Sequence, residues 1–237
     1  GPAATDSIQS LVTTGWDAFK NRMLVQEADL LVPGALFYGQ AQVVAKGEPG
    51  DNRGNNPGSR ELTYTWNGSA WVTGLGAGAF VQGSVLQRWA GATVGSGRNN
   101  YDDGHFVVGV KVTGPVNGFW HYEYAIHNQD NTRGGAALRI PLCATARVVN
   151  AGFRDIDADP LDDWTVSRTA TELAFLAAAN NPLDWNTIYN VWFDCDAAPE
   201  AISITACVTC CTAVLVWVAP LPSCSEVTAR MVAASRT

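Results

Sequence analysis

The chain has 237 residues, of which 47% are apolar, so it is long enough to bury one large hydrophobic core or two small ones without help from a metal. Charged residues make up only 16%, and 15 Lys and Arg against 22 Asp and Glu give a formal net charge of −7. An acidic surface repels phosphate, which argues against a nucleic-acid partner, and no stretch reaches the roughly 18 apolar residues of a membrane span.

Three regions follow one another along the chain. Residues 1–34 are predicted to form an N-terminal arm with one short helix or turn near residues 16–23. Residues 35–200 are predicted to form the strand-rich core, because short apolar and β-branched runs alternate there with turns rich in Gly, Asn and Pro. Residues 201–237 are predicted to add Cys-rich strands that complete or extend this core. The predicted strands cover residues 35–45, 61–66, 70–73, 84–90, 105–113, 119–127, 137–142, 147–153, 164–168, 172–176, 187–194, 201–207 and 213–218.

The clearest strand is residues 119–128, which read Phe, Trp, His, Tyr, Glu, Tyr, Ala, Ile, His, Asn. Aromatic and β-branched side chains suit a pleated strand. In an extended chain His121, Glu123 and His127 share one face, and the even-numbered, mostly apolar residues share the other. The sequence therefore predicts an all-β protein, an antiparallel β-sandwich of the jelly-roll or immunoglobulin-like kind with long decorated loops.

Six cysteines are present, and four of them fall in the last 31 residues. An even number in a chain of exported type predicts disulfides, with the pairing left open. Cys207 and Cys210 have the two-residue spacing of a zinc site, but no second pair with that spacing accompanies them. A bond between the neighbours Cys210 and Cys211 would be strained, so each is expected to pair elsewhere. The predicted disulfide cysteines are Cys143, Cys195, Cys207, Cys210, Cys211 and Cys224.

An acidic run at residues 154–163 follows a predicted strand. Alternating Asp residues bring hard oxygen donors around one point, as Ca²⁺ requires. The run lacks the central Gly and the closing Glu of an EF-hand, so that family is excluded. A structural Ca²⁺ site and a solvated acidic turn both stay open, and a glycosidase pair is a weaker alternative because Glu is absent. The candidate ligands are Asp155, Asp157, Asp159, Asp162 and Asp163.

Three of the nine tryptophans, Trp66, Trp71 and Trp89, flank Gly-rich turns. Flat aromatic rings stack on sugar rings, so Trp71 and Trp89 are candidate polysaccharide-binding residues. A sandwich core also takes Trp readily, and core packing is the competing interpretation.

Four segments within residues 105–200 carry a family resemblance. They are Tyr-Glu-Tyr-Ala-Ile-His-Asn, Gly-Phe-x-Asp-x-Asp, Asp-Trp-Thr and Trp-x-x-x-Tyr-Asn-x-x-Phe-Asp, at residues 122–128, 152–157, 163–165 and 185–194. In these segments the chain is similar to a family of secreted bacterial β-sandwich proteins that is common in planctomycete-type genomes. The resemblance implies export and a sandwich fold, and it implies no activity because the family has none assigned.

These patterns predict a secreted, non-enzymatic structural protein, a subunit of a surface assembly or filament made of copies of itself. A start at Gly1 rather than Met fits a processed, exported chain. Exposed strand edges pair with other strands unless they are covered, so the apolar run at residues 213–219 is expected to be covered by a neighbouring copy. The alternative prediction is a carbohydrate-binding module with a structural Ca²⁺ ion, and a secreted glycoside hydrolase is the third.

Overall fold

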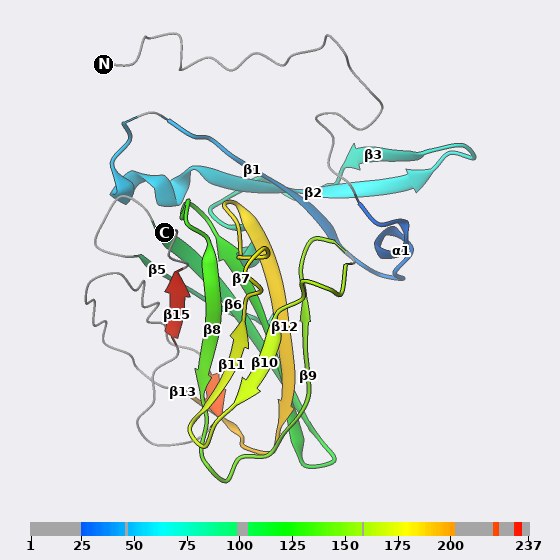
Figure 1. Cartoon of the computed structure of the whole chain (residues 1–237). Coiled ribbons are helices and arrows are strands. Elements are labelled where there is room, and N and C mark those ends of the chain that lie inside the picture. Colours follow the sequence, from blue (N-terminus) through cyan, green and yellow to red (C-terminus); the bar gives the residue numbers. More distant parts are fainter. Residues whose placement is uncertain are drawn as a thin grey trace. The chain divides into compact units, whose positions relative to one another are not determined.

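The computed structural model confirms the predicted all-β class (Figure 1). It describes residues 25–45, 47–98, 104–157, 159–201, 220–222 and 230–233. The predicted helix or turn at residues 16–23, the predicted strand at 213–218 and all but the first residue of that at 201–207 lie outside these ranges. None of the helices within them is long and apolar enough to cross a membrane. The helices are α1 (Glu27–Leu30) and the 3₁₀ helices η2 (Gly50–Asn55) and η3 (Val85–Arg88).

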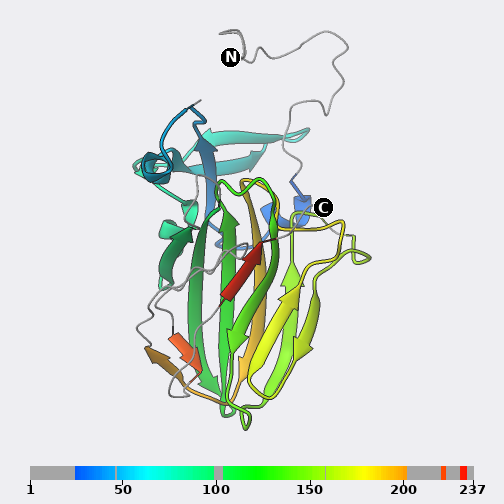
Figure 2. The same ribbon diagram turned by 60° about the vertical axis from the view of Figure 1, so that its left-hand side comes forward.

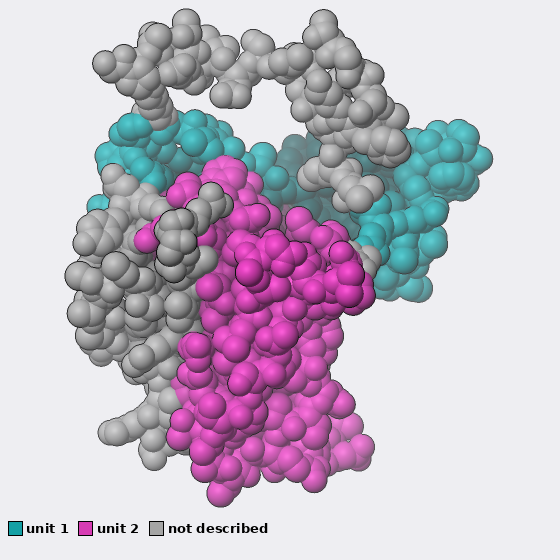
Figure 3. All heavy atoms as spheres, viewed as in Figure 1, with its two compact units in different colours: residues 1–83 teal, residues 84–237 magenta. Residues whose placement is uncertain are grey.

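The chain divides into two compact units, residues 1–83 and residues 84–237, which Figure 3 shows in different colours. The boundary falls inside the segment predicted as one sandwich core, residues 35–200, and the strands before Ser84 form a sheet of their own. Alternation along a strand predicts which face each side chain uses. It does not predict which other strand lies alongside, and for this reason the division was not foreseen.

Unit 1 contains one antiparallel sheet with β2 at its centre. Strand β2 pairs with β1 along one edge and with β3 and β4 along the other. The predicted Asn-Gly turn closes the hairpin between β2 and β3, where Asn67 Oδ1 accepts the backbone N–H groups of Ser69 and Ala70 at 3.0 and 2.9 Å. The strands are β1 (Phe37–Gln42), β2 (Pro57–Trp66), β3 (Trp71–Leu75) and β4 (Val81–Gln82).

Unit 2 contains two antiparallel sheets that lie face to face (Figures 1 and 2). The five-stranded sheet has the order β5 (Thr93–Arg98), β6 (His105–Val116), β7 (Phe119–Asn128), β12 (Thr187–Cys195) and β9 (Val148–Arg154). The four-stranded sheet has the order β10 (Thr165–Arg168), β11 (Glu172–Leu176), β8 (Gly135–Pro141) and β15 (Arg230–Ala233). A separate pair joins β13 (Pro199–Ala201) to β14 (Pro220–Pro222).

The hydrophobic core of unit 2 fills the space between these two sheets. Tyr122, Tyr124 and Ile126 of β7 point into it, as the alternation predicts, and all three are buried. The ring of Tyr122 stacks on that of Phe193 from β12, with 5.0 Å between the ring centroids. The opposite sheet contributes Leu138 and Ile140 of β8 and Leu173 and Phe175 of β11.

The prediction of a strand at residues 84–90 is wrong, because this segment forms η3. Ser84 caps the helix by accepting the Leu86 N–H at 3.3 Å on its side-chain oxygen. Leu86 and Trp89 then pack on the outer face of the five-stranded sheet, where Gly109 leaves room for the indole. Strand β5 was missed in turn, because its two glycines read as part of a loop.

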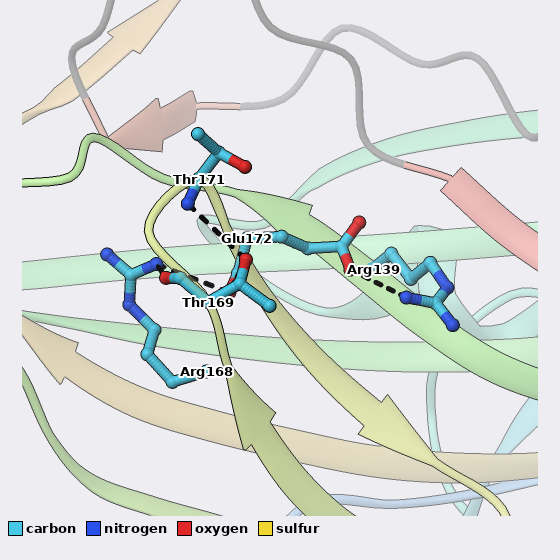
Figure 4. Close-up of polar contacts among 5 residues, drawn as sticks. All are labelled: Arg139, Arg168, Thr169, Thr171 and Glu172. Carbon is cyan, nitrogen blue, oxygen red and sulfur yellow. Dashed lines mark hydrogen bonds and ion pairs between the residues drawn. The ribbon is translucent and has the colours of Figure 1, made fainter.

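The turn between β10 and β11 is held largely by carbonyl oxygens (Figure 4). The Thr169 N–H donates to the Glu172 carbonyl at 2.9 Å. The Arg168 guanidinium donates to the carbonyls of Thr169 and Glu172 and, at 2.8 Å, to that of Cys143 after β8. Arg168 thus joins the hairpin to the neighbouring loop, while Arg139 pairs with the Glu172 carboxylate at 2.6 Å.

Replacing Phe193 by Ala is expected to lower the free energy of unfolding of unit 2 by about 3–5 kcal/mol, because a fully buried ring leaves a cavity behind. The control Val166→Ala, on exposed strand β10, is expected to change it by less than about 1 kcal/mol. Denaturant titration followed by circular dichroism measures both values. Equal losses in the two variants would contradict the described core.

Candidate functional site

The acidic run forms a loop that begins where β9 ends. One carboxylate oxygen from each of Asp155, Asp157 and Asp162 lies within 4.8 Å of the others. Side chains in the loop also accept backbone N–H groups two residues on: Asp155 from Asp157 at 3.1 Å, and Asp157 from Asp159 at 2.8 Å. These bonds wind the loop tightly, and they bring together three of the five predicted ligands, while Asp159 and Asp163 stay outside the converging group.

A single asparagine ties this loop to the core. Asn181 is buried, and its Nδ2 donates to Asp155 Oδ2 at 2.6 Å and to the Asp162 carbonyl at 3.0 Å. Its Oδ1 accepts the Tyr189 hydroxyl at 2.7 Å, and its own carbonyl accepts the Trp164 indole N–H at 2.8 Å. The acidic loop is therefore positioned by two core aromatic residues, a link that the spacing of the acids alone does not reveal.

The Asp162 carboxyl has a raised pKa and one carboxylate oxygen without a hydrogen-bond partner among the described residues. Desolvation raises the pKa of this carboxyl, and the charges of Asp157, Asp159 and Asp155 raise it further. Its Oδ2 accepts from Asn180 Nδ2 at 3.1 Å, whereas its Oδ1 is buried and has no hydrogen-bond partner among the described residues. A hard cation would offset the repulsion and contact that oxygen. The donor set fits Ca²⁺, which takes carboxylate oxygens as ligands.

The two predicted sugar-binding tryptophans belong to different units. In unit 1, Trp71 lies beside Trp66 with 5.8 Å between ring centroids, and its indole N–H donates to Glu27 at 3.0 Å. In unit 2, the Trp89 ring packs so closely over Gly109 that a Cβ there would lie 3.1 Å from it. The structure thus places Trp89 in a packed cluster and Trp71 on a more open surface.

That open surface is one face of the unit 1 sheet. Leu62 on β2 pairs with Phe37 on β1 and with Leu75 on β3, so the three side chains share a face. Trp66 and Leu75 keep 50% and 65% of their surface exposed. We call this surface the aromatic face; its residues are Phe37, Leu62, Tyr64, Trp66, Trp71, Leu75 and Phe80.

The prediction that all six cysteines form disulfides is wrong for Cys195, which is a free thiol. Cys195 is the last inward-facing residue of β12, so the alternation of that strand buries it among the core side chains. Burial also raises the pKa of the thiol. A bond between Cys143 and Cys195 is thereby excluded. The other predicted disulfide cysteines, Cys207, Cys210, Cys211 and Cys224, lie outside the described residues.

A buried chain of hydrogen bonds runs through His127, and sequence reasoning missed it. The Ser84 hydroxyl lies 3.0 Å from Nδ1 of His127, and Asn186 Oδ1 lies 3.3 Å from Nε2. An amide oxygen only accepts, so Nε2 carries the proton and Ser84 donates to Nδ1. The order serine, histidine, asparagine resembles a hydrolase relay, but Ser84 and His127 are both buried and Ser84 caps η3. This arrangement holds η3 against the sheet.

His127 is a neutral imidazole under ordinary conditions. Burial is the main cause that lowers its pKa from 6.5 to about 4, and nearby His105 lowers it further. The other outward histidine of β7, His121, lies at the far end of the strand, where its Nδ1 is 2.7 Å from Asp194 Oδ1. The two histidines of this face therefore do not meet in one site.

No protein-family model matches the chain, and no curated protein or solved structure matches it either. The similarity noted for residues 105–200 stays a prediction.

Ca²⁺ is expected to raise the melting temperature of unit 2. At a free Ca²⁺ concentration one hundred times the dissociation constant, the free energy of unfolding is expected to increase by about 2.7 kcal/mol. Asp157→Asn keeps the turn but removes a ligand charge, so it is expected to abolish the response. In EDTA the same variant is expected to be at least as stable as the parent, because one of the repelling charges is gone. Asp184→Asn, outside the converging group, is the control and is expected to keep the response. A parent chain whose stability does not change with Ca²⁺ would contradict the predicted Ca²⁺ site.

Unit 2 is expected to lose stability as the pH falls from 6.5 to about 4. The folded state keeps His127 neutral while the unfolded chain protonates it, so the free energy of unfolding drops by roughly 3 kcal/mol across this window and the loss levels off below it. Stability measured at several pH values in His127→Gln is expected to show a shallower slope. A slope in His127→Gln that matches the parent slope would show that His127 is not responsible.

Proposed function

We propose that this chain is a non-enzymatic structural subunit of an extracellular assembly and that two copies meet through the aromatic face of unit 1. The observation that carries the proposal is that, apart from Pro57, no apolar side chain among the described residues of unit 1 is buried, although its sheet presents seven aromatic and aliphatic side chains on one side. Contiguous exposed apolar surfaces of this kind mark interaction sites in soluble proteins.

Covering the face is energetically favourable. Burial of apolar surface contributes roughly 25 cal/mol for each Å² removed from water, and large aromatic side chains supply most of that area at interfaces. The rings are already arranged in pairs: Phe37 meets Tyr64 edge to face at 5.1 Å, and Trp66 meets Trp71 at 5.8 Å. A surface that is ordered before binding loses little side-chain entropy on association.

The charges on this face favour a second copy as the partner. Arg60 lies on the same side of β2 as Leu62, two residues before it. In a two-fold pairing centred between Leu62 and Tyr64, Arg60 of each copy comes opposite Trp66 of the other. A guanidinium over an indole face is attracted by it, and Glu27, bonded to the neighbouring Trp71, adds an opposite charge. The same patch thus complements itself.

Extension from pairs to a larger assembly needs a second contact, and strand edges are the proposed means. Strand β1 is hydrogen-bonded to a neighbour on one side only, within the described part of the sheet. The low charge of the chain and the similarity of residues 105–200 to secreted proteins support an extracellular setting. The apolar run at 213–219, expected to join in such contacts, lies outside the described residues.

The double variant Trp66→Ser, Leu75→Ser is expected to sediment as a monomer at micromolar concentration, whereas the parent chain sediments as a larger species. The control Val72→Ser changes a residue that is 49% exposed on the opposite face of β3 and is expected to leave the parent behaviour intact. Analytical ultracentrifugation measures all three. A monomeric parent chain, or equal dissociation in the control, would refute the proposed interface.

A further inference from the structure

The outer face of the five-stranded sheet in unit 2 is covered by η3 over only part of its area. Close to η3, Leu86 and Trp89 pack over Val107 and Ala125. Further along the same strands most of the outward side chains are polar, and several of them are half-buried. These side chains are Lys111, His121, Glu123, Trp192 and Asp194.

Trp192 lies flat on this part of the sheet. A Cβ built on Gly152 of β9 would lie 2.4 Å from Cζ2, 2.5 Å from Cε2 and 2.8 Å from Nε1 of the indole. With the flat geometry of an indole, these three distances place that position above the ring plane, at the rim next to Cε2. Gly152 therefore makes room for one face of the indole. Trp192 is only half-buried, so part of the indole stays accessible to solvent.

Polar groups surround the indole in the register of the sheet. Trp192 pairs with Glu123 of β7, which pairs in turn with Lys111 of β6. Asp194, two residues further along β12, pairs with His121. Residues directly opposite each other in an antiparallel sheet have Cβ atoms about 5 Å apart and diagonal neighbours about 7–8 Å, so Glu123 lies beside Trp192 and His121 lies diagonally from it.

We propose that this face of unit 2 binds a neutral polysaccharide, with one sugar ring stacked on Trp192 and its hydroxyl groups bonded to Glu123 and His121. A pyranose ring has C–H groups on its faces and hydroxyl groups around its rim. A flat indole bordered by hydrogen-bonding side chains matches both features. His121 offers Nε2 to the sugar because its Nδ1 is held by Asp194 at 2.7 Å.

The charges of the site indicate a neutral chain rather than an acidic or basic one. Lys111 and Arg154 bring two positive charges to this face, and Glu123 and Asp194 bring two negative ones, so the side-chain charges offset each other. The Asp194 carboxylate accepts from Asn150 Nδ2 at 2.6 Å and from His121, and these bonds, that from Asn150 first, lower its pKa. Asp194 is thereby fixed as the residue that positions His121.

The sugar site does not rest on the proposed self-assembly, because it lies in unit 2 and the aromatic face lies in unit 1. It also differs from the pair Trp71 and Trp89 that the sequence suggested. Trp89 is packed under η3 on the same sheet, and Trp71 belongs to unit 1. The sequence did not predict Trp192 as a sugar-binding residue because it lies within a regularly alternating strand, where an aromatic residue is typical of a β-sheet.

Affinity gel electrophoresis of the full chain tests the proposal with soluble β-glucan, xylan, galactomannan and starch, and with alginate and a sulfated galactan as charged polymers. At least one neutral polymer is expected to slow the parent chain. Trp192→Ala is expected to weaken that binding by about tenfold or more, which corresponds to the loss of one good stacking contact. The control Trp185→Ala removes an indole that is 39% exposed in the loop before β12 and should bind as the parent does.

His121→Ala is the second variant, because the His121 side chain is 42% exposed and its loss leaves the core untouched. It is expected to weaken binding with no change in thermal stability, which separates lost recognition from lost folding. The proposal is overturned if none of the neutral polymers slows the parent chain, if only charged polymers do, or if Trp192→Ala and His121→Ala, both folded, bind as well as Trp185→Ala.

Discussion

The rest of unit 2 depends on the alternation of apolar and polar side chains between the two faces of strand β7. Its even-numbered residues close the core against the opposite sheet, so its odd-numbered residues must face outward. A shift of the β7 register by one residue would bury His121 and Glu123 and expose Tyr122 and Tyr124. The free-energy cost of burying these polar groups would unfold the unit. The polar groups of the outer face are therefore held in place by the packing on the other side of the same strand.

Period-two alternation was enough to predict most strands of the sandwich, and β11 matches its predicted bounds, Glu172–Leu176, at both ends; β5 and β15 were missed. It failed where other forces decide. Residues 84–90 are as apolar as a strand, but Ser84 caps a helix there and the indole of Trp89 needs the bare surface over Gly109. The separation of the first four strands was equally hidden, because pairing between strands distant in sequence leaves no local signal.

Spacing predicted the acidic loop because ligands two residues apart can turn toward one point. It did not separate Asp162, which joins Asp155 and Asp157, from its neighbour Asp163, which does not. The inclusion of Asp162 depends on Asn181, which holds both Asp155 and the Asp162 backbone, and no sequence pattern points to this asparagine. The site at Trp192 was hidden for a related reason: the position of its indole depends on the missing side chain of Gly152, forty residues earlier in the chain.

Because Trp164 is hydrogen-bonded to Asn181, the fluorescence of this buried indole is expected to report on the acidic loop of unit 2. The indole N–H donates to the backbone of the residue whose amide grips Asp155, so any displacement of the loop changes the surroundings of an enclosed chromophore. Indole fluorescence responds to such changes in hydrogen bonding and local field. A displacement of the charged, solvent-facing loop is thus expected to change the fluorescence of Trp164 in the core, and no attached dye is needed to detect it.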